Sequence, residues 1–113
     1  MTRNKKKGYV YLIGNWDTPN FYKIGVTRGN IKKRIKELQT GNPSELWTVK
    51  YHETDYPFFV EKQLHFRFRA KHVEGEWFEL TIAEMLNFEN VCNQIEQMIE
   101  GMKDNEFFMK NLK

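Results

Sequence analysis

Four side chains between residues 11 and 61 are of types that could together bind and hydrolyse a phosphodiester. Arg34 carries a planar, permanently charged guanidinium that can donate to two phosphate oxygens at once. Glu61 offers carboxylate oxygens, which are ligands that hard divalent cations prefer. Tyr11 could orient or deprotonate a water molecule, but a tyrosine pKa of about 10 requires a nearby cation, which Lys23 could supply. These residue types favour metal-assisted hydrolysis of a phosphodiester.

Further polar and aromatic side chains could assist this chemistry or contact a nucleic acid. His65 could act as a second base or donate to a phosphate oxygen. Tyr9 or Tyr22 could take the place of Tyr11 beside the water molecule. The predicted nucleic-acid contacts are Tyr9, Tyr22, Lys33, Arg67 and Arg69.

Each of these residues also has a purely structural interpretation, and the residues alone leave both open. Tyrosines in strands often pack half-buried, and Arg34 lies among lysines, as solvated surface residues do. Glu61 and His65 are four residues apart, so they could form a hydrogen-bonded pair that satisfies an edge of the core. A solvated edge is equally compatible with the basic strip Arg67, Arg69, Lys71 and His72.

The elements that must position these side chains begin with a predicted hairpin. Residues 8–14 and 21–27 are rich in β-branched and aromatic residues, and turn-forming residues separate them. A helix then begins after Asn30 as N-cap and runs to about Gln39, before Gly41 and Pro43. At about 100° per residue, three lysines of this helix point away from its apolar face, whereas Arg34 lies beside that face. Arg34 can therefore reach over the sheet. That apolar face consists of Ile31, Ile35 and Leu38.

The remaining segments complete a predicted α+β domain. We expect a third strand at 45–53 and a second helix from Pro57 to about Ala70, whose apolar stripe contains Glu61. A glycine turn and a short extended segment follow at 73–80, and then one long amphipathic helix at 81–101. The order of elements predicts a small three-stranded antiparallel sheet flanked by helices. The long stripe could pack on its own sheet or on a second copy, so a monomer and a homodimer both remain open.

The composition suits one domain of a chain with a mild basic excess. The chain has 113 residues, a net charge of +3 and a single cysteine, Cys92. We therefore expect one domain at 8–101, a basic flexible arm at 1–7 and a C-terminal tail at 102–113. A lone cysteine excludes an internal disulfide framework and favours a reducing, cytoplasmic location. No apolar run is long enough to span a membrane.

At these residues the sequence resembles the GIY-YIG nuclease superfamily, and most closely the branch typified by a bacteriophage T5 open reading frame, common in phages and bacteria. The resemblance covers roughly residues 8–80. It rests on five sequence features that occur in the order typical of the family. Two further segments, Thr40-Gly41-Asn42-Pro43 and Gly75-Glu76-Trp77-Phe78, also match this branch. The five features are Tyr9-Val10-Tyr11, Lys23-Ile24-Gly25 preceded by Tyr22, Arg34, Glu61 and His65.

The resemblance implies a metal-dependent endonuclease that cuts DNA with Mg²⁺ or Mn²⁺. In this family Glu61 would hold the ion, Tyr11 would orient or deprotonate the water, and Arg34 would neutralise charge on the phosphoryl oxygens. His65 would be a supporting residue. Lys23 stands where most of the superfamily has tyrosine, although the branch tends to carry lysine there. A second hypothesis is therefore a nucleic-acid-binding module that keeps the fold and cleaves little or not at all.

Overall fold

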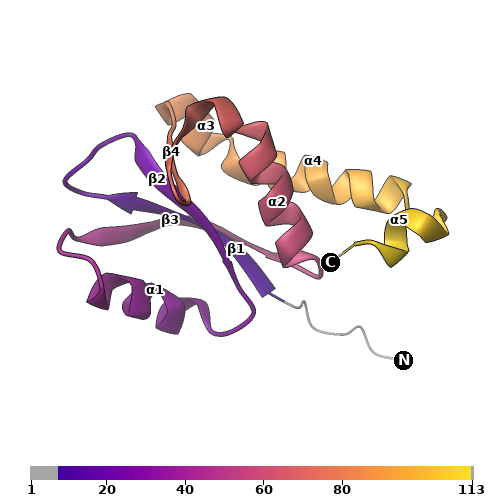
Figure 1. The fold of residues 1–113 in the computed structure, drawn as a ribbon, viewed down its shortest axis with the longest axis horizontal. Helices are drawn as coiled ribbons and strands as arrows, with labels where there is room; N and C mark the ends of the chain where they lie inside the picture. Colours follow the sequence, from indigo (N-terminus) through magenta and orange to yellow (C-terminus); the bar gives the residue numbers. More distant parts are fainter. Residues whose placement is uncertain (1–7, 113) are drawn as a thin grey trace.

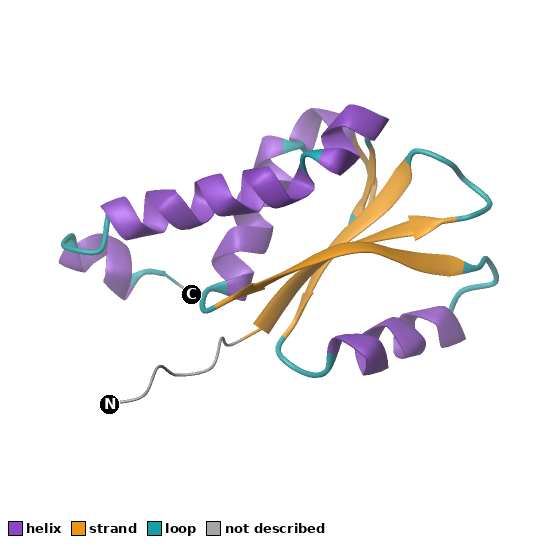
Figure 2. Cartoon of the chain, turned by 180° about the vertical axis from the view of Figure 1, so that it is seen from behind, coloured by secondary structure: helices purple, strands orange, loops and turns teal. Residues whose placement is uncertain are grey.

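The computed structural model describes residues 8–112, so the predicted arm at 1–7 lies outside the described residues. Helices cover both faces of one antiparallel sheet, whose strand order is β3-β1-β2-β5-β4. Helix α1 lies on one face, while α2 and α4 lie on the other (Figure 1), and Figure 2 shows the same arrangement from behind. The strands are β1 Gly8–Asn15, β2 Phe21–Thr27, β3 Leu46–Thr54, β4 His72–Glu74 and β5 Trp77–Glu79. The helices are α1 Ile31–Thr40, α2 Pro57–Arg67, α3 Ile82–Leu86, α4 Phe88–Gly101 and α5 Glu106–Lys110, with a 3₁₀ turn at Arg69–Lys71.

The α+β class is confirmed, but the predicted three-stranded sheet is wrong because the sheet has five strands. A tight hairpin at Gly75, whose φ of +56° favours glycine, joins β4 to β5. Strand β5 then pairs with only the first part of β2, from Phe21 to Lys23. The rest of β2 keeps an edge that no strand covers in the described chain, and the candidate site forms along this edge.

Local capping defines the helix that carries Arg34. The side chain of Asn30 accepts a hydrogen bond from the backbone N–H of Lys33 at 2.9 Å, so Asn30 is the N-cap as predicted. The helix ends at Thr40, with Gly41 as C-cap. Pro57 is also at the first turn of α2, as predicted.

The predicted single helix at 81–101 is wrong, because the chain forms α3 and α4 with a break at Asn87. A capping box between Thr81 and Glu84 starts α3. Asparagine disfavours a helix interior because its side chain competes for local hydrogen bonds, and Asn87 Oδ1 accepts from Asn90 at 3.0 Å. The apolar stripe of α4 is buried in the chain's own core, and the tail forms α5, with Phe108 packed against that core.

Side chains of β1 alternate between two apolar clusters, one on each face of the sheet. Val10 and Leu12 join the larger cluster, which contains the buried stripe of α2. Tyr11 and Ile13 join the smaller cluster, which α1 covers. This alternation follows from the two-residue period of a strand. It places Tyr11 and Arg34 on the same side of the sheet.

Within residues 8–112, no helix combines the length and apolar character that crossing a membrane would require.

Candidate active site

Tyr11 and Arg34 meet on the face of the sheet that α1 covers. The Nε of Arg34 donates to the hydroxyl oxygen of Tyr11 at 3.4 Å. Tyr11 is paired with Gly25 across β1 and β2. A side chain at Gly25 would overlap the tyrosine ring, since a Cβ there would lie 2.5 Å from its Cζ and 2.6 Å from its Cε1. Glycine at this position therefore lets the phenol lie flat across β2 and present its hydroxyl to Arg34.

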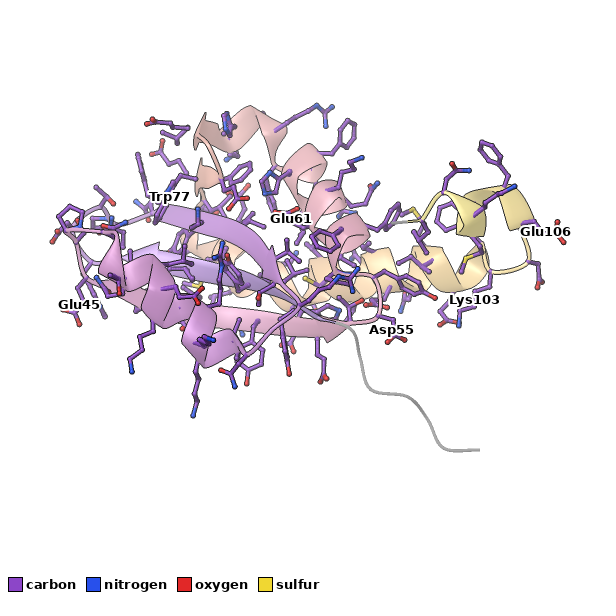
Figure 3. The ribbon with its side chains drawn as sticks, turned by 60° about the horizontal axis from the view of Figure 1, so that its bottom comes forward. Glu45, Asp55, Glu61, Trp77, Lys103 and Glu106 are labelled. Carbon is purple, nitrogen blue, oxygen red and sulfur yellow. The ribbon has the colours of Figure 1, made fainter. Side chains whose placement is uncertain are left out.

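Helix α2 packs against β2 and brings His65 to its uncovered edge. Glu61 lies one turn earlier on α2 and is labelled in Figure 3. The Nε2 of His65 lies 2.9 Å from the carbonyl oxygen of Ile24, and because a carbonyl only accepts, this nitrogen carries the proton. The Oε2 of Glu61 lies 3.6 Å from the same nitrogen. His65 therefore satisfies the outward carbonyl of an edge strand and stands beside the carboxylate of Glu61.

The other backbone group of Ile24 is also satisfied along this edge. Its N–H donates to the carbonyl oxygen of Glu76 at 3.0 Å. The side chain of Glu76 forms an ion pair with Lys23, with Nζ and Oε1 3.1 Å apart. The Lys23 ammonium also lies over the Trp77 ring, 5.9 Å from its centroid. The backbone of Ile24 thus bonds His65 of α2 and the backbone of Glu76, and so brings both segments to one stretch of β2.

The pKa of the Tyr11 hydroxyl is raised above its usual value, chiefly because the hydroxyl is buried. The hydrogen bond and positive charge of Arg34 oppose this effect, and the negative charges of Glu76 and Glu61 add to it. That Lys23 could lower the pKa of Tyr11 stays a prediction, since Lys23 is paired with Glu76 in this structure. The cation that acts on Tyr11 is Arg34, while Lys23 is neutralised by Glu76.

The pKa of Glu61 is also raised, again chiefly by burial. The charges of His65 and Lys23 lower it, and the charge of Glu76 raises it. Since each of these groups acts on another, they form one electrostatic unit drawn from five parts of the chain. We call it the polar cluster, and its members are Tyr11, Lys23, Arg34, Glu61, His65 and Glu76.

Glu76 is the member of the polar cluster to which the sequence analysis assigned no role. Its only signal was its place in Gly75-Glu76-Trp77-Phe78, which had been noted for its resemblance to the T5-type branch. A glutamate beside a glycine turn is ordinary in a surface hairpin. Glu76 joins the polar cluster because β5 pairs with β2 and brings its carboxylate to Lys23.

A cavity of about 250 Å³ lies beside the polar cluster. Lys23 and Trp77 line it from the sheet, and Glu37 and Leu38 line it from α1. Glu37 also lies 3.6 Å from Nη1 of Arg34. The cavity is therefore lined by Lys23 and by Glu37, the neighbour of Arg34 on α1.

The predicted nucleic-acid contacts are dispersed. The assignment of Tyr22 is wrong, because its side chain is 6% exposed and packs in the larger core. Tyr9 is half-buried with its ring edge-on to Tyr51, and Lys33 is exposed on α1. Arg67 is exposed, and its Nη1 donates to Oε1 of Gln94 on α4 at 3.1 Å. Around the axis of α2, Arg67 lies about 120° from Glu61.

Arg69 is exposed as well. Its guanidinium lies over the ring of Phe66, 3.9 Å from the centroid, and donates to the carbonyl oxygen of that residue at 2.7 Å. Arg69 and Arg67 thus bond residues outside the polar cluster, and the structure does not bring them together with Tyr11 and Arg34.

Among the described residues, no group of three or more histidine, cysteine, aspartate or glutamate side chains could hold a metal ion. The carboxylate of Glu61 nevertheless suits a hard cation, because burial disfavours its charge and a cation would compensate. Mg²⁺ is commonly bound by one or two carboxylates, with waters and substrate phosphates completing its shell. The donor set therefore fits a cation shared with a substrate phosphate better than a metal centre made by the protein alone.

The fold and the site define a small α+β domain with acidic and basic groups gathered on one edge of its sheet. A family model described as the T5orf172 domain matches residues 8–103, and the chain belongs to this family. The match runs past the 8–80 segment that carries the sequence motifs and includes the whole of α4. No curated protein matches the chain. No solved structure matches it either.

Proposed function

We propose that this chain is a metal-dependent endonuclease of the GIY-YIG type that hydrolyses DNA phosphodiester bonds. The observation that carries the proposal is the contact between Arg34 of α1 and Tyr11 of β1. The guanidinium of Arg34 bonds the hydroxyl of Tyr11, and the carboxylate of Glu61 acts electrostatically on that same hydroxyl. Membership of the T5orf172 domain family and the motif resemblance support the same activity.

In this proposal Glu61 holds Mg²⁺ or Mn²⁺ together with phosphate oxygens. The cation, when bound, supplies positive charge to the phosphoryl group and acidifies coordinated water. Arg34 binds the non-bridging oxygens and stabilises the charge that develops on them in the transition state. The remaining steps depend on the chain's own residues.

Tyr11 positions the attacking water in this mechanism. Arg34 donates to the phenolic oxygen, so the hydroxyl keeps its own proton to donate to water or phosphate. Because its pKa is raised, Tyr11 is neutral in the free protein at pH 7, and a base role requires further positive charge near it. His65 is a positioning residue, since its proton is engaged by the carbonyl of Ile24.

A second candidate function is a DNA-binding module with the same fold and little or no cleavage. The observation that favours it is the pairing of Lys23 with Glu76, which leaves Tyr11 without the second cation that would activate it. A module of this kind would bind DNA through the same cluster and would not need the carboxylate of Glu61.

A plasmid-nicking assay separates the two functions. We expect wild-type protein to nick DNA with Mg²⁺ or Mn²⁺ and to stop in EDTA. Arg34→Ala and Glu61→Gln should each lower the rate by about 100-fold or more, the order seen when a transition-state charge partner is removed. Lys36→Ala is the matched control, because it removes an exposed cation from the same helix and should leave the rate within about twofold.

The two refuting outcomes differ. Equal trace rates for wild type and both variants would mean that the nicking comes from a contaminant, and the enzyme proposal would fail. DNA binding without any metal-dependent nicking would establish the binding module instead.

A further inference from the structure

Lys23 and Glu76 form an ion pair whose two side chains differ in exposure. The side chain of Lys23 is 17% exposed, whereas that of Glu76 is 42% exposed. Lys23 lies within β2, opposite Trp77 of β5, and its ammonium lies over the Trp77 ring. Glu76 lies at the hairpin tip, directly after Gly75. The lysine is therefore the more buried partner, and the more exposed carboxylate is the one that an incoming anion can displace.

We propose that the Glu76 carboxylate occupies the place on the Lys23 ammonium that a DNA phosphate takes, so that Glu76 sets the affinity of the chain for DNA. The inference rests on the proposed function and deepens it by assigning a residue that regulates the affinity for DNA. A carboxylate is the side chain that most resembles a phosphodiester anion, because it also offers two oxygens that share one negative charge. An ammonium held at 3.1 Å by such a group has its charge neutralised until an anion displaces the carboxylate.

The hairpin geometry allows this exchange at small cost. The backbone carbonyl of Glu76 is anchored to the N–H of Ile24, so only the side chain has to move. A Cβ at Gly75 would meet no atom within 4 Å, which shows open space at the tip. Ion pairs with an exposed partner are weak, because water competes for both charges. After Glu76 swings out, the ring of Trp77 still holds the ammonium in place.

An incoming strand also has room at this position. The cavity of about 250 Å³ is lined by Lys23 and Trp77, so the ammonium faces a hollow and not a packed core. On its other side the cavity reaches α1, where Arg34 stands beside Glu37. A phosphate on Lys23 would therefore sit at the mouth of this cavity.

The test is DNA binding by fluorescence anisotropy, with a short fluorescein-labelled duplex in EDTA so that cleavage does not interfere. Glu76→Gln should tighten binding by up to about fivefold, which corresponds to breaking one exposed ion pair. The slope of log K against log salt concentration should stay the same, because in both proteins one phosphate takes the place on Lys23 in the complex. Glu79→Gln, an equal charge change on the same hairpin at an exposed position, should alter affinity by less than about twofold and leave the slope unchanged.

The double variant Lys23→Met with Glu76→Gln should lose the gain in affinity, and its slope should be shallower by about 0.9 because the phosphate contact at Lys23 is removed. The proposal is overturned if Glu76→Gln binds no tighter than Glu79→Gln, including the case in which neither binds. It is also overturned if the gain survives in the double variant, or if the slope of Glu76→Gln steepens by about 0.9, which would mean that a phosphate reaches Lys23 only in the variant. These binding measurements do not depend on nicking. The proposed exchange at Lys23 can therefore be refuted while the nuclease activity is confirmed, and the nuclease activity can be refuted while the exchange is confirmed.

Discussion

Gly25→Ala tests whether the phenol of Tyr11 lies across β2 as the structure has it. The new methyl group would lie 2.5 Å from Cζ and 2.6 Å from Cε1 of Tyr11, closer than non-bonded carbon atoms approach. The ring cannot step aside, because Tyr11 is fully buried in the cluster that α1 covers. The site must therefore distort.

The size of the effect follows from two opposing terms. Overpacking a well-filled site costs about 1–3 kcal/mol. Replacing a strand glycine by alanine returns about 0.5–1 kcal/mol through reduced backbone entropy in the unfolded chain. The packing term is larger, so we expect a net loss of about 1–2 kcal/mol. At about 4 °C per kcal/mol for a chain of this size, Tm should fall by roughly 4–8 °C.

The assay is urea unfolding followed by circular dichroism, with Gly41→Ala as the matched control. A Cβ at Gly41 meets no atom within 4 Å and its φ is −91°, so this variant should unfold within about 0.5 kcal/mol of wild type. Adding Tyr11→Phe to Gly25→Ala should not restore stability, because Cζ and Cε1 remain. If Gly25→Ala is as stable as Gly41→Ala, the ring does not lie across Gly25, and the placement of Tyr11 beside Arg34 loses its basis.

Two other predictions concern groups whose pKa is shifted by burial. Glu61→Gln should stabilise the protein by about 1 kcal/mol at neutral pH, because a half-buried carboxylate is disfavoured. The raised pKa means that the folded chain binds the Glu61 proton more tightly than the unfolded chain does. The destabilising effect of the ionised carboxylate therefore grows as pH rises through the folded pKa. In urea titrations the stability advantage of glutamine should vanish below the ordinary carboxyl range, at about pH 4. A loss of stability at neutral pH would instead show that the carboxylate makes net favourable contacts. Burial raises the pKa of the Cys92 thiol to about 12, so Ellman's reagent should modify this thiol only after the protein unfolds. Fast labelling of the native protein would contradict the packing of α4.

Local sequence determined the elements that carry most of the polar cluster. Asn30 caps α1 through a bond to a backbone group three residues on, and Pro57 starts α2 because its ring suits a first turn. Periodicity placed Arg34 beside the apolar face of its helix, where it reaches Tyr11. These signals act over a few residues, so they can be read without knowledge of the rest of the chain.

Tertiary structure alone decided which segments share the edge of β2. Whether Tyr22 or Lys23 faces the core depends on which helix covers each side of the sheet, and Tyr22 proved to be the core residue. Glu76 reaches Lys23 only because β5 pairs with the first half of β2. Strand pairing and burial depend on contacts between residues far apart in the chain, and the short-range patterns that predict helices and turns contain no information about them.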